Sequence, residues 1–388
     1  MEDALIPQAV RETLGLQTTH DVERRKEHIF ETLVRGARHV TMFYAEGHGQ
    51  LRSRWIDRSL WERWGPAMTD AGDTTSVSYR LSLANSLPAP VPKSKAVAVR
   101  LRGFAFSASA LDTYLRCPLQ FYYRFILRLG EKEDAGAELE APEIGRFVHD
   151  CLREFFAPRV GHPLNPDELK GADMEEVVGR EFRSLTGTIA MGSLALVARQ
   201  VRLHLGQFVT EYQIPRARRE TITIEGLEQK YAVTKFGFRF EGRIDRVERR
   251  NGTVTILDYK TGKDSAAYAI RFKLLNPDDR STWHTSIGSV QLPFYTLLYS
   301  THHGVPPKTV HAAYLHLGRN KITEEIEEGV DEDGLNGHHE ILENLLRRLV
   351  EEIADGGTPF SPPPDPRKAC PGCPFQSMCG TQWIKGWR

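Results

Sequence analysis

The sequence predicts an α/β protein whose first quarter is mostly helical. Strands are expected over residues 240–263, where two runs of strand-forming residues flank the turn dipeptide Asn251-Gly252. Amphipathic helices are expected over residues 143–156 and 335–353, where apolar residues recur at helical spacing. A composition of 40% hydrophobic and 26% charged residues is typical of a globular protein with a sizeable core.

The length and charge of the chain narrow the function classes. Its 388 residues predict two domains or one large elaborated domain. The apolar runs fall short of a membrane span and no signal peptide is visible, so we expect a cytoplasmic protein without a membrane partner. No phosphate-binding loop of the type G-x-x-x-x-G-K-[ST] occurs, which argues against ATP hydrolysis by this chain. The net charge is zero, but residues 91–130 carry seven basic side chains against one acidic side chain and could face phosphates.

The N-terminal region offers no catalytic constellation. Helices are expected over residues 22–37 and after Ser53, with a short strand over residues 39–46 between them. The Pro- and Ser-rich stretch 85–95 is the best linker candidate. We therefore expect a helical segment over residues 1–90, a linker over residues 91–104 and a second domain over residues 105–388.

The second domain begins with a helix and a run of aromatic and basic residues. Ser107 or Ser109 can cap a helix that continues to Leu119. Behind it, Tyr122, Arg124 and Arg128 could stack on bases and grip phosphates. Packing in the core explains the tyrosines at least as well.

The hairpin brings two acids and a lysine together. A two-residue turn at Asn251-Gly252 sets the strand register and places Asp245 directly opposite Asp258. Side chains alternate along a strand, so Lys260 shares the face of Asp258. Like charges directly opposite each other are destabilising, and a divalent metal such as Mg²⁺ between the carboxylates would relieve the repulsion. The alternative is an exposed charged hairpin, or a bulge that shifts the register.

The cysteines form the second strong signal. Cys370, Cys373 and Cys379 follow a C-x2-C-x5-C pattern in a proline-rich tail, which indicates metal binding, and Cys117 is the natural fourth ligand. Cys151 fits the core of a helix as a buried thiol. A four-cysteine site holds either zinc or an iron-sulfur cluster, and the spacing itself slightly favours zinc.

In combination, these motifs resemble the RecB-like branch of the PD-(D/E)XK nucleases. Within it they are most similar to the iron-sulfur nuclease domain of AddB-type recombination subunits and to the related CRISPR-associated exonuclease. The resemblance covers about residues 105–388, and residues 1–90 resemble the end of the AddB helicase-like region. The residues that carry it follow in chain order: Cys117; Gly145 and His149; Gly242 and Asp245; Asp258 and Lys260; Gln291 and Tyr295; Cys370, Cys373 and Cys379.

The resemblance implies a metal site. His149, Asp245 and Asp258 would bind the metal, together with the backbone carbonyl of Tyr259. Taken alone, His149 is more often a packed, hydrogen-bonded residue than a ligand. No motif assigns Glu228, which lies in an earlier expected strand.

The remaining catalytic roles also follow from the resemblance. Lys260 would orient the attacking water and stabilise charge on the phosphate. Gln291 and Tyr295 would support the site or position the DNA strand.

The resemblance also implies a fold and a function. The fold would be restriction-endonuclease-like, with a mixed central sheet flanked by helices and a [4Fe-4S] cluster joining the two ends of the domain. The activity would be that of a Mg²⁺- or Mn²⁺-dependent DNA exonuclease, acting on ends or single strands in double-strand break repair and recombination with a helicase or helicase-nuclease subunit. One alternative is a DNA-binding or helicase-partner scaffold that does not cut, and another is a zinc-stapled structural protein.

Overall fold

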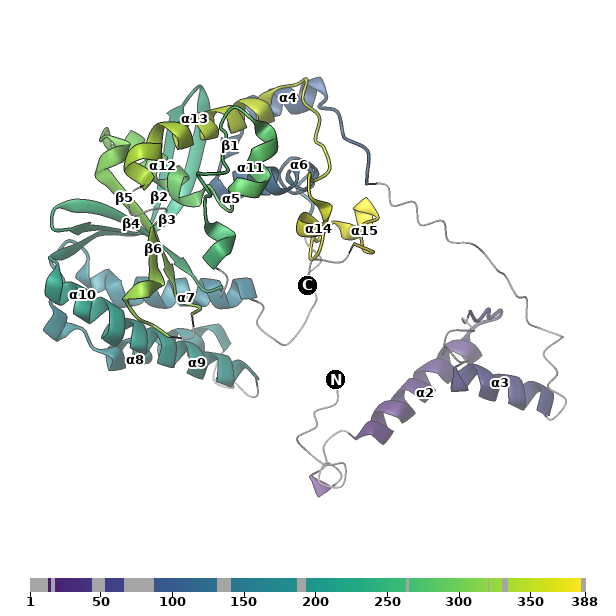
Figure 1. Ribbon diagram of the computed structural model, residues 1–388. Helices are drawn as coiled ribbons and strands as arrows, with labels where there is room; N and C mark the ends of the chain where they lie inside the picture. The colour runs from purple at the N-terminus through teal and green to yellow at the C-terminus, as the bar shows by residue number, and fades with distance from the viewer. Residues whose placement is uncertain are drawn as a thin grey trace. The chain divides into compact units, whose positions relative to one another are not determined.

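The chain consists of two compact units, residues 1–84 and 85–388. Figure 1 shows their helices and strands. The computed structural model describes residues 13–14, 18–43, 53–65, 87–130, 141–186, 193–262, 265–319, 321–329 and 334–384.

The described part of the first unit is helical. Helix α2 (Thr19–Gly36) begins at a capping box formed by Thr18 and Asp21, and α3 (Arg54–Trp64) begins at Ser53, whose side chain accepts a hydrogen bond from the Trp55 amide. These two helices confirm the expectation for this region. The strand expected over residues 39–46 is wrong for its described part, residues 39–43, because no described strand of this unit lies beside it to complete a ladder.

The second unit is built on a mixed six-stranded sheet, as expected. The strand order is β1-β3-β4-β5-β6, and β2 pairs with the other edge of β3. The β1–β3 and β4–β5 pairs are parallel, and the remaining pairs are antiparallel. The strands are β1 (Ala105–Phe106), β2 (Ile222–Lys235), β3 (Phe238–Arg250), β4 (Thr253–Lys260), β5 (Val310–His316) and β6 (Glu327–Gly329).

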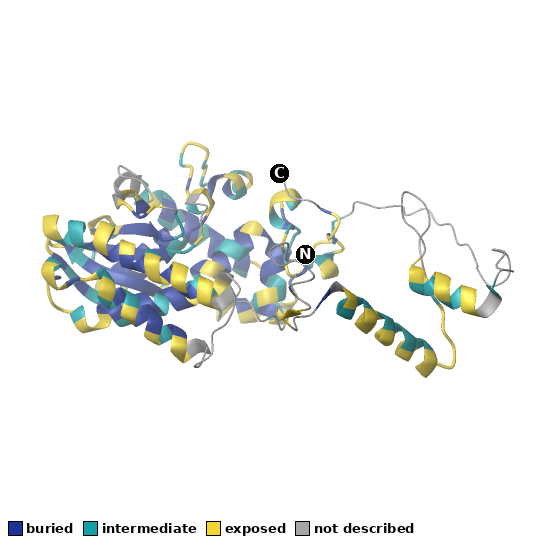
Figure 2. Cartoon of the chain, turned by 90° about the horizontal axis from the view of Figure 1, so that it is seen from below, coloured by how far each residue is buried: buried dark blue, intermediate teal, exposed yellow. Residues whose placement is uncertain are grey.

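Helices cover both faces of the sheet and enclose two hydrophobic cores. Figure 2 shows the buried residues concentrated on the sheet and on the helix faces turned toward it. The expected helices at 143–156 and 335–353 are confirmed as α7 and α13. One core is covered by α4 (Lys95–Arg102), α5 (Ala108–Arg116), α12 (Gln291–His303) and α13 (Gly334–Ala354). The other is covered by α7 (Ala141–Phe156), α8 (Gly171–Thr186), α9 (Ser193–Gln207) and the π-helix η5 (Phe208–Gln213).

Shorter helices complete the unit, and every helix of the described residues is too short or too polar to cross a membrane. The α-helices among them are α6 (Pro118–Phe121), α10 (Ile214–Arg219), α11 (Arg280–Ser286), α14 (Pro366–Ala369) and α15 (Gln376–Cys379). The π-helix η2 spans Tyr122–Ile126, and the 3-10 helices are η3 (Ala157–Arg159), η4 (Pro166–Glu168), η6 (Ser265–Tyr268), η7 (Pro307–Thr309) and η8 (Glu324–Ile326).

Two expectations at the start of this unit are corrected. The expected linker 91–104 contains α4, whose Leu101 is fully buried, and Lys93 donates hydrogen bonds to the carbonyls of Glu352 and Asp355 at the end of α13. The helix expected to run to Leu119 breaks at Cys117, because the residue before a proline disfavours the helical conformation.

Candidate active site

The site lies where strands β3 and β4 separate. Asn251 and Gly252 have φ angles of 46° and 91°, as a type I′ turn requires. The register runs from Arg250–Thr253 to Arg246–Leu257, as predicted. Beyond this last pair the ladder opens, and the amide of Tyr259 donates a 2.9 Å hydrogen bond to Asp245 Oδ2. Asp245 and Asp258 therefore line the opening.

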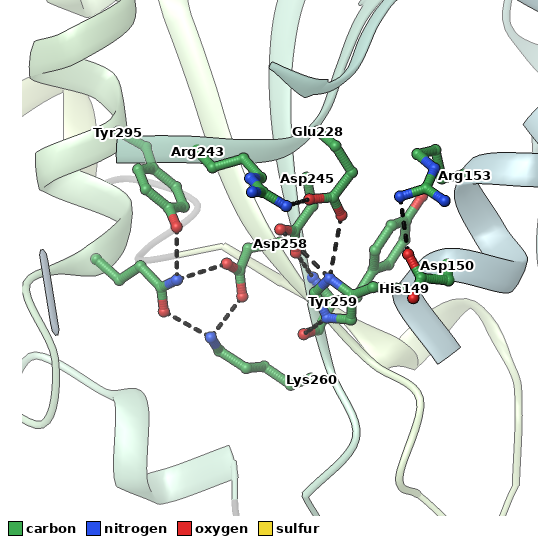
Figure 3. Close-up of polar contacts among 11 residues, drawn as sticks. His149, Asp150, Arg153, Glu228, Arg243, Asp245, Asp258, Tyr259, Lys260 and Tyr295 are labelled. Carbon is green, nitrogen blue, oxygen red and sulfur yellow. Dashed lines mark hydrogen bonds and ion pairs between the residues drawn. The ribbon is translucent and has the colours of Figure 1, made fainter. Parts of the chain in front are cut away.

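Lys260 and two residues of α12 surround Asp258 (Figure 3). Lys260 Nζ lies 2.6 Å from Asp258 Oδ2 and donates a 2.5 Å hydrogen bond to Gln291 Oε1. Gln291 Nε2 donates to Asp258 Oδ1 at 2.7 Å and to the hydroxyl oxygen of Tyr295 at 2.8 Å. The predicted common face of Asp258 and Lys260 is confirmed, and Gln291 and Tyr295 join it from one side of a helix.

His149 reaches the other side of Asp245 from α7. Its Nδ1 atom lies 3.3 Å from Glu228 Oε1 and 3.4 Å from Asp245 Oδ1, while Nε2 lies 3.2 Å from the Tyr259 carbonyl oxygen. Ligand atoms of His149, Glu228 and Asp245 all lie within 4.8 Å of one another. Imidazole, carboxylates and a main-chain carbonyl form a donor set that fits Mg²⁺ or Mn²⁺.

Glu228 is the ligand that the sequence motifs did not assign. Strands β2 and β3 form a second tight hairpin, with positive φ at both Phe236 and Gly237. The pairs Leu227–Arg246 and Gln229–Ile244 bracket Glu228 and place it opposite Asp245. The dipeptide Phe236-Gly237 is the only local signal for this hairpin, and it is much weaker than Asn-Gly.

Burial and mutual repulsion shape the electrostatics of the site. Burial, reinforced by the charge of Asp245, raises the pKa of Asp258 to about 7, although Lys260 opposes the shift. Burial would lower the pKa of His149, but hydrogen bonds to Asp245 and Glu228 outweigh it and raise this pKa to about 10. Three carboxylates thus converge on three cationic groups, those of Lys260, His149 and Arg243, the last lying 3.4 Å from Glu228. A divalent cation bound here would compete with these groups for the carboxylate oxygens.

Two tyrosines that the sequence motifs did not indicate enclose the lysine. Lys260 Nζ lies 4.8 Å from the ring centroid of Tyr268 and 5.1 Å from that of Tyr314. Both distances are within the range of cation–π attraction. Together with Asp258 and Gln291, these rings hold the ammonium group in one position.

One glycine of the sequence motifs allows a helix to approach the site closely. A Cβ atom on Gly242 would lie 2.9 Å from Leu298 Cδ1, so α12, which carries Gln291, packs directly on the β3 backbone. A Cβ atom on Gly145 would lie 3.4 Å from Thr261 Oγ1, an ordinary contact distance just beyond the end of β4.

Four cysteines line a separate small cavity. Cys117, Cys370, Cys373 and Cys379 surround it together with Tyr123 and Phe375. Cys151 is fully buried in the helical core, as predicted. Among the described residues, no three of the four sulfurs lie within 4.8 Å of one another.

The three residues expected to contact DNA lie on or just after η2. Tyr122 stacks on Phe360 with ring centroids 4.9 Å apart, so one face of its ring is used in packing. Arg124 and Arg128 are exposed, and Arg128 has a φ angle of 56°. None of the three lies among the residues around Lys260.

Comparisons with known proteins agree with this arrangement. The profile described as "PD-(D/E)XK nuclease superfamily" matches residues 105–380. Three similar proteins are each named as a subunit of an ATP-dependent helicase/deoxyribonuclease. The protein from Ruminiclostridium cellulolyticum is 27% identical over 46% of this chain and 17% of its own length. That from Enterococcus faecalis is 24% identical over 40% and 15%, and that from Clostridium acetobutylicum is 23% identical over 56% and 20%. The matches thus span 20% or less of the length of these relatives.

Proposed function

Because this chain belongs to the PD-(D/E)XK nuclease superfamily, we propose that it is a metal-dependent deoxyribonuclease. The observation that carries the proposal is the convergence of Asp245, Asp258 and Lys260 at the opening of one hairpin. His149 and Glu228 extend the same cluster from α7 and β2.

Each residue has a distinct task in this proposal. His149, Glu228, Asp245 and the Tyr259 carbonyl hold Mg²⁺ or Mn²⁺, with Asp258 at the side nearest Lys260. When bound, the metal acts as a Lewis acid toward the phosphodiester.

Lys260 orients the attacking water and stabilises the negative charge that develops on the phosphate. Gln291 fixes the positions of Lys260 and Asp258 relative to each other by forming a hydrogen bond with each, and Tyr295 holds Gln291 in place through a further hydrogen bond.

We further propose that the substrate is DNA, cut as an exonuclease from ends or along single strands during double-strand break repair and recombination. A helicase or helicase-nuclease subunit is the proposed partner. The names of the relatives, which combine helicase and deoxyribonuclease, support both assignments.

Cleavage assays with matched variants test the activity. Asp258→Ala and Lys260→Ala should each abolish Mg²⁺- or Mn²⁺-dependent cleavage of labelled DNA while DNA binding measured without metal persists. Lys308→Ala, an exposed lysine of η7, is the control and should cut normally. Binding without any cleavage by the unmodified chain would indicate a scaffold instead.

We propose that the four cysteines hold a [4Fe-4S] cluster. The four cysteines come from the two ends of the second unit and line one cavity, as a four-thiolate ligand set requires. The resemblance of the sequence motifs to iron-sulfur nuclease domains favours the cluster over zinc.

Metal analysis of anaerobically purified protein tests this assignment. We expect iron and acid-labile sulfide together with broad visible absorption that bleaches on reduction. The Cys151→Ser protein should retain this absorption, whereas Cys373→Ser should lose it. Stoichiometric zinc without iron would refute the cluster.

A further inference from the structure

A cavity of about 380 Å³ lies between the candidate active site and the cysteine region. Its walls come from α5, from the segment that begins with η6, from α11 and from the chain around α14. Figure 1 shows α5 and α11 close together. No part of the site described above explains this cavity.

The rim of the cavity is basic. Arg116, Arg271, His284 and Lys368 line it, and the charge of Arg116 acts on the carboxylate of Asp112 in the same cavity. Arg116, Arg271 and Lys368 are exposed to solvent. The rim therefore presents several cationic side chains to a ligand.

The two acidic residues of the cavity are occupied by protein donors. Asp112 accepts hydrogen bonds from Ser289 Oγ at 2.6 Å and from the Val290 amide at 2.8 Å. Asp365 caps α14 by accepting hydrogen bonds from the backbone amides of Arg367 and Lys368. Their charge is partly balanced within the wall, so the basic rim dominates the field that a ligand meets.

The cavity lies next to the candidate active site. Its lining residue Asp112 bonds to Ser289 and Val290, which directly precede Gln291, the residue that bonds Lys260 and Asp258. The wall that follows β4 joins the segment 286–288 through the Ile270–Ile287 bridge and a 2.9 Å hydrogen bond from the Gly288 amide to the Ala269 carbonyl. A Cβ atom on Gly288 would lie 2.5 Å from the Ala267 carbonyl oxygen, so the two walls are in tight contact.

The remaining lining is apolar. Leu115, Ile287 and four alanines form much of the surface beneath the basic rim. A volume of about 380 Å³ is near the lower end of the range of about 300–1,000 Å³ found for small-ligand pockets. The cavity thus combines an apolar surface that suits a planar ring with cations that suit a phosphate.

We propose that this cavity binds one unpaired nucleotide of the DNA strand that is cut at the adjacent site. The inference rests on the proposed nuclease function and adds a binding site to it. The base lies on the apolar surface, and the basic rim holds the neighbouring phosphates. A base that is stacked and paired within a duplex cannot enter such a pocket, so the strand is single at this position.

Binding of fluorescein-labelled single-stranded oligonucleotides without metal tests the proposal separately from catalysis. The Arg116→Ala/Lys368→Ala protein should bind more weakly, and its slope of log K against log salt should decrease by about 1.4, because each lost phosphate contact contributes about 0.7 for single strands. The matched control Arg180→Ala/Lys308→Ala also removes one exposed arginine and one exposed lysine, and should keep the original slope.

A second variant and a scan of abasic positions locate the pocket. Arg271→Ala should decrease the slope by about half as much as the double variant. One abasic position in the oligonucleotide should weaken binding of the unmodified chain and have little effect on the double variant. Equal slopes for the double variant and its control would overturn the pocket, and so would an equal slope decrease on blunt duplex DNA. Cleavage of DNA by the unmodified chain would still support the nuclease assignment in either case. If the unmodified chain cuts no DNA, the nuclease assignment itself is refuted.

Discussion

A buried ion pair next to the candidate site gives the sharpest stability prediction. Arg246 follows Asp245 in β3, is fully buried, and has its guanidinium 4.3 Å from the ring centroid of Phe156. It pairs with the buried carboxylate of Glu248 and donates a 2.9 Å hydrogen bond to Gln213. Replacing Arg246 with Met would leave Glu248 with only part of its charge compensation. Because removing one partner of a buried pair typically costs about 3–5 kcal/mol, we expect the free energy of unfolding to fall by that amount.

A double variant separates the loss of charge balance from the loss of packing. Arg246→Met/Glu248→Met removes both charges and leaves Arg250 paired with Glu327 at 2.7 Å. Replacement of a whole buried pair by apolar residues of similar volume is often neutral, so the double variant should recover most of the lost stability.

Urea unfolding followed by circular dichroism measures these differences. The exposed Arg180→Met control should stay within about 0.5 kcal/mol of the unmodified protein. A single variant that costs less than about 1 kcal/mol, or a double variant whose cost equals the sum of the two single costs, would refute the reasoning.

Three further changes probe other parts of the molecule. Gly242→Ala should cost about 1–3 kcal/mol in urea unfolding and reduce cleavage, because its Cβ atom would lie 2.9 Å from Leu298 Cδ1 and displace α12; unchanged activity would contradict the close packing. If the proposed cluster joins Cys117 to the C-terminal cysteines, Cys117→Ser should lower the thermal midpoint, because the chain-entropy model gives a cross-link over so long a loop up to about 5 kcal/mol. Cys151→Ser should have only a local effect, and equal midpoints for the two variants would contradict the proposed cross-link. Burial raises the pKa of Asp112 from 3.8 to about 6. The folded chain therefore binds this proton more tightly, so stability decreases as pH rises through that window; Asp112→Asn should flatten this part of the pH–stability curve, and an unaltered curve would contradict the shift.

Local chemistry explains why the hairpin could be predicted. Asn251-Gly252 suits a turn with two positive φ angles, and such a turn determines the pairing of every residue behind it. The pairing of Arg246 with Leu257 shows that the register holds up to the candidate site. Helices α7 and α13 could also be predicted from the sequence, because apolar residues at helical spacing identify the face that each helix buries.

Long-range packing explains what could not be predicted. The stretch around Lys93 has the composition of a linker, yet it is held by the carbonyls at the end of α13, more than two hundred residues later in the chain. The rings of Tyr268 and Tyr314 meet Lys260 only after η6 and β5 are in place. No local pattern encodes such contacts, because they depend on how distant elements pack.

The two hairpins together account for the position of the acidic cluster. The turn at Phe236-Gly237 places Glu228 opposite Asp245, and the turn at Asn251-Gly252 places Asp245 opposite Asp258, so three carboxylates lie at one level of three neighbouring strands. The β2–β3 ladder stays closed past this level, because Gln229 still pairs with Ile244. Between β3 and β4 the last pair is Arg246 with Leu257, and beyond it the Tyr259 amide bonds to the side chain of Asp245. The opening therefore follows from strand register and from this side-chain bond, and the helices bring a histidine and a glutamine to it.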